Sequence, residues 1–138
     1  MPDRRDISPV GWYVASYQMR FVELADTRPD DPSRRFLVWE NTVLVTAKTP
    51  REAYRKVVKI GKEGTRPYRA GPDRRKVQWK FEGVTEFLPV YEEIGDGAEI
   101  MWAERTLSLR TIRRLAKPLE AFQPSRSGVA GRVNGSGK

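Results

Sequence analysis

Residues 36–61 read FLVWENTVLVTAKTPREAYRKVVKIG, and the spacing of their apolar side chains changes midway. In the first half they recur at every second position, which is typical of a half-buried strand. In the second half they recur at intervals of three and four, which is typical of an amphipathic helix. Thr49 as a cap, a proline after it and Glu52 form a helix-start signal. The stretch predicts a strand over 36–47 and a helix over 50–62.

Further strands are predicted on both sides of this stretch. Residues 12–24 alternate in hydrophobicity, and a polar connection leads from them into 36–47, so these two strands are expected to pair as a hairpin. After the helix, alternation predicts strands over 77–83, 86–93 and 98–105. A Gly-Asp-Gly turn between the last two predicts a second hairpin.

The expected fold is α+β, a mostly antiparallel sheet of about five strands in the order β-β-α-β-β-β with one helix on a face. Gly83 permits a bulge or bend, and Pro89 indicates a sheet edge or a bulge. Inward-pointing aromatic and branched residues are expected to build the core. They are Tyr13, Tyr17, Trp39, Val43, Val45, Val57, Trp79, Phe81 and Trp102.

The segments flanking this domain differ from it in composition. Residues 1–11 are predicted to be a flexible lead, and 12–105 the globular domain. Residues 106–122 return to a helical pattern and predict a basic helical extension, with its helix near 107–117. Residues 123–138 are rich in Gly and Ser with little to bury, which predicts a disordered basic tail.

The chain contains no histidine and no cysteine in 138 residues. The commonest general base, thiolate nucleophiles, zinc fingers and disulfides are therefore excluded. No phosphate-binding glycine loop is present either. The sequence predicts a protein that is not an enzyme and uses no cofactor or metal. The charged first residues and the lack of a long apolar run predict a cytoplasmic protein without a transmembrane segment.

Five short segments carry a resemblance to a known family. They are Trp12-Tyr13-Val14-Ala15, the strand from Val38 to Val45, Glu52-Ala53-Tyr54, the segment from Trp79 to Val84, and the segment from Asp96 to Ile100. Together they resemble a small bacterial domain-of-unknown-function family, the one numbered 4288, over roughly residues 12–105. The resemblance implies a stand-alone bacterial protein or module and no established activity, so it transfers no catalytic residue.

Charge is segregated along the chain, whose net charge is +8. Residues 50–80 carry eleven basic and three acidic groups, and 81–104 carry seven acidic groups and no basic one. Residues 105–138 carry eight basic groups and one acidic group. A uniform positive charge would favour general polyanion binding, whereas segregated charge also suits protein partners.

Two basic segments are the candidate partner-binding sites. The first is a loop over 62–76 with Arg66, Arg69, Arg74, Arg75 and Lys76. The second is the C-terminal arm with Arg110, Arg113, Arg114, Lys117, Arg126 and Arg132. Arginine dominates both, and its planar guanidinium suits bidentate contacts with carboxylate or phosphate.

These features favour a non-enzymatic binding module, an accessory subunit that docks on a larger protein assembly through the basic loop and the arm. A nucleic-acid-associated protein that contacts phosphates through the same segments is the first alternative. An immunity or antitoxin-like inhibitor is the second. Self-association of the acidic hairpin with the basic loop is a further option for a partner.

Asn41 is the one polar residue among the apolar inward positions of the strand over 36–47. A buried amide without hydrogen bonds costs about 1–3 kcal/mol. Asn41 is therefore a polar anchor in a pocket, the mark of a bulge, or a side chain that satisfies nearby backbone groups.

Overall fold

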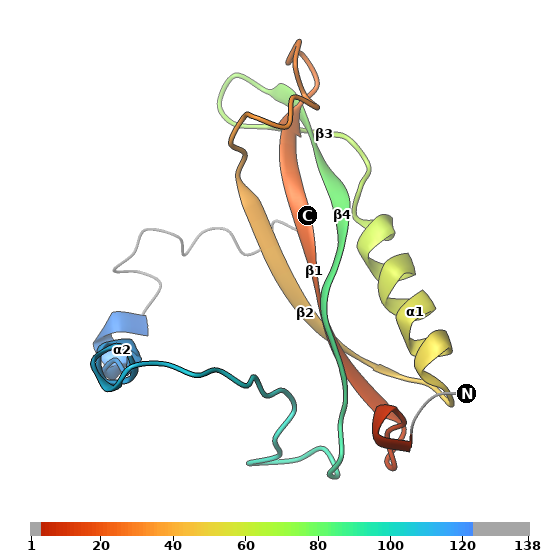
Figure 1. Cartoon of the computed structure of the whole chain (residues 1–138). Helices are drawn as coiled ribbons and strands as arrows, with labels where there is room; N and C mark the ends of the chain where they lie inside the picture. Colours follow the sequence, from red (N-terminus) through yellow and green to blue (C-terminus); the bar gives the residue numbers. More distant parts are fainter. Residues whose placement is uncertain (1–3, 123–138) are drawn as a thin grey trace. The chain divides into compact units, whose positions relative to one another are not determined.

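The computed structural model describes residues 4–122. A four-stranded antiparallel sheet carries one long helix on a face, and a short helix follows further along the chain (Figure 1). The strands are β1 (Trp12–Glu23), β2 (Val38–Thr46), β3 (Tyr68–Ala70) and β4 (Arg75–Pro89), and the helices are α1 (Pro50–Glu63) and α2 (Leu109–Leu115). The order across the sheet is β2-β1-β4-β3. The predicted α+β class is confirmed, with four strands instead of about five.

The strand β1 lies between β2 and β4 and pairs with both along most of its length. The predicted hairpin of the first two strands is confirmed, with Trp12 opposite Thr46 and Arg20 opposite Val38. The alternation over 12–24 indicates one buried side, but Val14 and Ser16 on the other side of β1 are buried as well.

The predicted strands over 77–83 and 86–93 form the single strand β4. Gly83 joins them with φ +112°, a conformation that favours glycine. Tyr17 pairs with Val84 but Met19 pairs with Phe81, so β4 contains an extra residue at this point. The glycine thus makes a bulge inside one strand and does not separate two strands.

The predicted strand over 98–105 and its hairpin with 86–93 are wrong. The turn between them exists, with the Ala98 N–H donating to the Gly95 carbonyl at 3.0 Å. The chain has no helix or strand between Pro89 and α2, however, so the residues before and after the turn do not pair as a hairpin. As a consequence Trp102, predicted as core, is 48% exposed.

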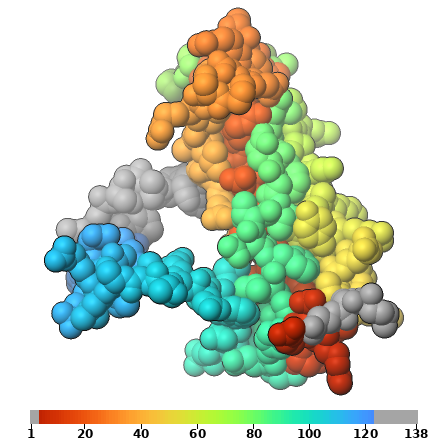
Figure 2. Space-filling view, in the orientation of Figure 1, coloured from red at the N-terminus to blue at the C-terminus, as the bar shows by residue number. Residues whose placement is uncertain are grey.

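The helix α1 covers one face of the sheet, as Figures 1 and 2 show in yellow. The Thr49 hydroxyl accepts the Glu52 N–H at 3.1 Å, and the Glu52 carboxylate accepts the Lys48 N–H at 2.9 Å, so the predicted helix start is confirmed. The helix turns a stripe of small residues toward the sheet, all of them buried: Ala53, Val57 and Gly61. Small residues allow the helix backbone to approach the sheet closely.

The hydrophobic core lies between α1 and this face of the sheet. Of the predicted core residues, five are buried, namely Tyr13, Tyr17, Val45, Val57 and Trp79. Three more pack against them while partly exposed, namely Trp39, Val43 and Phe81. Aromatic pairs run across the strands, including Tyr13 with Phe87 and Trp39 with Trp79.

Residues 4–11, which belong to the predicted flexible lead, contain a short helical turn and a buried serine. Arg4–Asp6 forms a single 3-10 turn, and Ser8 is buried. The Ser8 hydroxyl donates to the Val90 carbonyl at 2.6 Å and accepts the Trp12 N–H at 3.1 Å. One serine therefore ties the start of β1 to the end of β4, a long-range role that composition does not reveal.

Candidate interaction surfaces

The described part of the C-terminal arm contains one short helix, α2, within a unit that spans residues 103–138. Ser108 caps it by accepting the Thr111 N–H at 3.2 Å. The helix ends at Leu115, and Leu119–Phe122 forms a 3-10 turn. The helix predicted near 107–117 is therefore somewhat shorter than expected, because Pro118 disfavours helical geometry just before it.

The helix α2 is amphipathic, and its apolar side is open to solvent. Leu109 is 57% exposed, Ile112 51% and Leu115 48%. At about 100° per residue these three side chains occupy one side of the helix, and Arg110, Arg113 and Arg114 occupy the other. Every large apolar residue in the described part of this unit from Leu107 onward is exposed.

The basic side of the arm has no internal counterion in the part of the chain that the structure describes. Arg110, Arg113, Arg114 and Lys117 are exposed and make no ion pair within the described part of their own unit, residues 103–122. Two other predicted binding residues, Arg126 and Arg132, lie outside the described residues, as does the predicted disordered tail over 123–138.

The predicted basic loop over 62–76 contains a tight hairpin of β3 and the start of β4. Arg69 pairs with Lys76 across it, and Gly71 and Arg74 adopt positive φ in the turn. Ala70 opposite Arg75 completes the ladder. A loop rich in Gly, Pro and charge thus forms a short edge strand, because the turn brings its two ends together.

The basic side chains of this hairpin are not equivalent. Arg75 is paired internally, with Glu23 at 2.9 Å and Asp73 at 3.0 Å. Arg69 donates to the Arg74 carbonyl at 3.0 Å. The side chains of Arg66, Arg74 and Lys76 are exposed and make no ion pair within residues 4–122, so these three remain available to a partner.

A basic stripe on α1 was not among the predicted sites. Arg51, Arg55, Lys59 and Lys62 are exposed and form no ion pair with the described residues. At about 100° per residue they fall within about 80° of one another, opposite the buried side of the helix. The spacing i, i+4, i+8, i+11 was visible in the sequence, and it marks a continuous row of cations.

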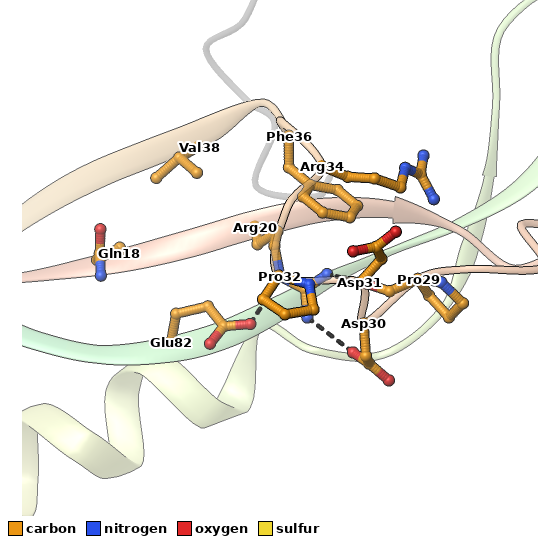
Figure 3. Close-up of a pocket in the computed structure, with 10 residues that line it drawn as sticks. All are labelled: Gln18, Arg20, Pro29, Asp30, Asp31, Pro32, Arg34, Phe36, Val38 and Glu82. Atoms are coloured by element: carbon orange, nitrogen blue, oxygen red, sulfur yellow. Dashed lines mark hydrogen bonds and ion pairs between the residues drawn. The ribbon is translucent and has the colours of Figure 1, made fainter.

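A polar pocket of about 380 Å³ lies where the β1–β2 connection meets β4, with Arg20 at its centre (Figure 3). The Arg20 guanidinium donates to Glu82 at 2.7 Å, to Asp30 at 3.1 Å and to the Pro29 carbonyl at 2.5 Å. Its Cζ atom lies 4.7 Å from the centroid of the Phe36 ring.

The partners of Arg20 explain the role of this pocket. The hydrogen bond to the Glu82 carboxylate, followed by that to Asp30, raises the pKa of Arg20. Two carboxylates already balance the positive charge of Arg20, which disfavours the binding of an anionic ligand there. The cluster fastens the β1–β2 connection to β4 and is structural.

The acidic residues of 81–104 do not gather into a metal site. Among residues 4–122, no three acidic side chains are grouped in a way that could hold a metal ion. No helix in this range is long and apolar enough to cross a membrane.

The fold is that of a small α+β domain, with one helix on a curled antiparallel sheet. The domain carries exposed basic surfaces. The chain matches the family model described as a domain of unknown function, DUF4288, over residues 12–102, and it belongs to that family. The resemblance noted in the sequence is thereby confirmed. Searches of curated proteins and of solved structures gave no match to this chain.

Proposed function

We propose that this protein is a binding module that docks on a protein assembly through its C-terminal arm. The observation that carries the proposal is the open apolar side of α2 at Leu109, Ile112 and Leu115. Covering the exposed part of these side chains stabilises a complex, because apolar area removed from water contributes about 25 cal/mol per Å². An amphipathic helix that lays this side into a groove is a common mode of protein recognition.

The charge of the arm indicates the kind of groove. Arg110, Arg113 and Arg114 flank the apolar stripe, and the described part of the arm after residue 104 has one acidic residue, Glu120. Arginine forms bidentate contacts with carboxylates. The expected partner is a protein with an apolar groove rimmed by acidic residues. The exposed hairpin residues Arg66, Arg74 and Lys76 provide a second contact to the same partner.

The experiment compares the full chain with the double variant Ile112→Ser, Leu115→Ser in pull-downs from host lysate. The matched control is Leu24→Ser, which alters a leucine of similar exposure in the sheet domain. The proposal predicts that the arm variant loses a defined protein set at least about tenfold, because two apolar contacts are removed. Equal recovery by all three chains contradicts it.

A membrane surface is the competing partner for a basic amphipathic helix. Binding of the purified chain to vesicles of anionic lipid, with loss in the Ile112→Ser, Leu115→Ser variant, would contradict protein docking by the arm. Vesicles of neutral lipid are the control for nonspecific adsorption.

The alternative of nucleic-acid binding is favoured by the stripe of Arg51, Arg55, Lys59 and Lys62 on α1. Four phosphate contacts predict that the logarithm of the binding constant falls against the logarithm of salt concentration with a slope of about −3 to −4. Lys59→Ala is expected to reduce that slope by about one, because one contact is lost. Binding without a salt slope contradicts this alternative.

A further inference from the structure

The strand β2 is the outermost strand of the sheet on one side (Figure 1). The Phe21 N–H donates to the Leu37 carbonyl at 3.0 Å, and the Ala47 N–H donates to the Gly11 carbonyl at 3.0 Å. In an antiparallel pair, bonded and non-bonded residue pairs alternate. The odd-numbered residues of β2 therefore bond to β1, and the even-numbered residues point their backbone groups outward.

The outward-pointing groups belong to five residues: Val38, Glu40, Thr42, Leu44 and Thr46. Within residues 4–122, the only hydrogen bond to this outer row of backbone groups is from the Lys56 ammonium to the Thr46 carbonyl, at 2.5 Å. An open strand edge is a template for pairing with another chain.

Natural proteins usually protect such an edge. The two open edges of this sheet, along β2 and along the free part of β4, differ in that respect. The free part of β4 carries Lys80, Glu82, the Gly83 bulge and the terminal Pro89, all of which disfavour pairing. The nine residues of β2 contain no proline, glycine or lysine, and Glu40 is their one charge. The β2 edge is therefore the one built to accept a strand.

We propose that β2 pairs antiparallel with β2 of a second copy, around a twofold axis at Asn41, to form one continuous eight-stranded sheet. Twofold interfaces use the same patch on both subunits, so the edge must be complementary to itself. This register places Val38 opposite Leu44 of the partner subunit, and Glu40 opposite Thr42 of the partner subunit. Apolar residues then meet apolar ones, and polar residues meet polar ones.

Neighbouring registers lack this match. If the twofold axis lies at Thr42 instead, Glu40 faces Leu44 of the partner subunit. If the axis lies at Glu40, this residue faces Glu40 of the partner subunit. Like charges directly opposite each other on paired strands are destabilising. Val38 and Leu44 are 46% and 38% exposed in the single chain, so the proposed register also covers two apolar side chains.

Asn41 supplies an independent observation. It lies half-buried opposite Tyr17, and its side-chain amide has no hydrogen-bond partner within the described chain. At the twofold axis it faces Asn41 of the partner subunit in a non-hydrogen-bonded pair, where side chains approach most closely. Each amide can donate to and accept from the other. The dimer thus satisfies the polar residue that the single chain leaves without a partner.

The first test is the mass of the full chain in solution, measured by sedimentation across a concentration series. The proposal predicts a monomer–dimer equilibrium. Asn41→Asp is expected to raise the dimer dissociation constant more than about tenfold at neutral pH, because it brings two carboxylates together. Ile112→Ser in the arm is the control and is expected to leave the mass unchanged. A wild-type chain that is monomeric at every concentration overturns the proposal.

The second test determines the register in which the two β2 strands pair. Val38→Lys with Leu44→Lys places like charges across the interface and is expected to abolish the dimer. Val38→Glu with Leu44→Lys pairs opposite charges across the same positions and is expected to restore it. Both residues are substantially exposed, so each variant should keep the wild-type secondary structure and still unfold cooperatively, which circular dichroism checks. A dimer that both variants retain, or that both lose, overturns the register.

Discussion

Gly61 in α1 lies directly against Phe81 in β4. A Cβ added to Gly61 would lie 2.4 Å from two ring carbons of Phe81 and 3.3 Å from the Tyr17 ring. Such distances are far inside van der Waals contact, and Tyr17 restricts where the Phe81 ring can move, since the two ring centroids are 5.9 Å apart. The glycine sets how closely the helix approaches the sheet.

Gly61→Ala is therefore expected to lower the free energy of unfolding by about 1–2 kcal/mol. Overpacking costs about 1–3 kcal/mol, and alanine's helix propensity returns up to about 1 kcal/mol. Urea denaturation measures the difference. Gly64→Ala is the matched control, because a Cβ there would lie 4.0 Å from the nearest atom, the Met19 methyl. Equal effects of the two substitutions would show that the close approach is not limiting.

Thr49→Ala is expected to destabilise the protein by about 1 kcal/mol, because it removes the hydroxyl that accepts the Glu52 N–H. Thr49→Ser keeps this hydroxyl and should remain within a few tenths of a kcal/mol of the wild type. Thermal unfolding monitored by circular dichroism distinguishes the two variants. If serine is as damaging as alanine, the cap does not determine the helix start.

Arg20→Met is expected to cost about 1–2 kcal/mol. It removes the hydrogen bonds to Glu82, Asp30 and the Pro29 carbonyl. The cost is moderate because both carboxylates reach water and can be resolvated. Arg28→Met is the control, since the Arg28 side chain is 70% exposed and its ion pair is worth little. Chemical denaturation of the two variants side by side measures the contrast.

Acid is expected to weaken the β1–β2 connection. The Arg28 N–H and then the Arg34 guanidinium lower the pKa of Asp26 below its ordinary 3.8, and the Ser33 N–H and hydroxyl do the same for Asp31. A carboxyl whose pKa is lower in the folded state stabilises the fold above its unfolded pKa, and this stability is lost as pH falls through the folded value.

The measurement is the denaturant midpoint as pH falls from about 5 to below the ordinary aspartate pKa of 3.8. The wild-type midpoint should fall over this range. Asp26→Asn cannot titrate at that position and should show a shallower fall. An unchanged slope in the variant would mean that Asp26 does not link stability to pH.

The parts of the fold that the sequence predicted are those fixed by local rules. The alternation in β1 and β2 and the capping signal at Thr49 depend on neighbouring residues only, and the corresponding elements begin within two residues of their predicted starts. The predicted strand over 98–105 also alternates, but a strand needs a paired neighbour, and β4 ends at Pro89. Local pattern cannot reveal whether an edge is available.

The candidate sites likewise divide into features that neighbouring residues determine and features that the strand pairing determines. The sequence located the basic residues of the hairpin, but the pairing of Arg75 with Glu23 depends on the sheet register and could not be predicted. Asn41 was recognised as a polar residue that needs a partner. Its position on an open edge became visible only once the strand order placed β2 outermost.

The most direct test of protein docking by the arm is a pull-down with the full chain from host lysate, divided into nuclease-treated and untreated halves. The account predicts a defined protein set that survives nuclease and is lost from the Ile112→Ser, Leu115→Ser variant. Proteins that vanish with nuclease treatment, or that the variant retains fully, would contradict it.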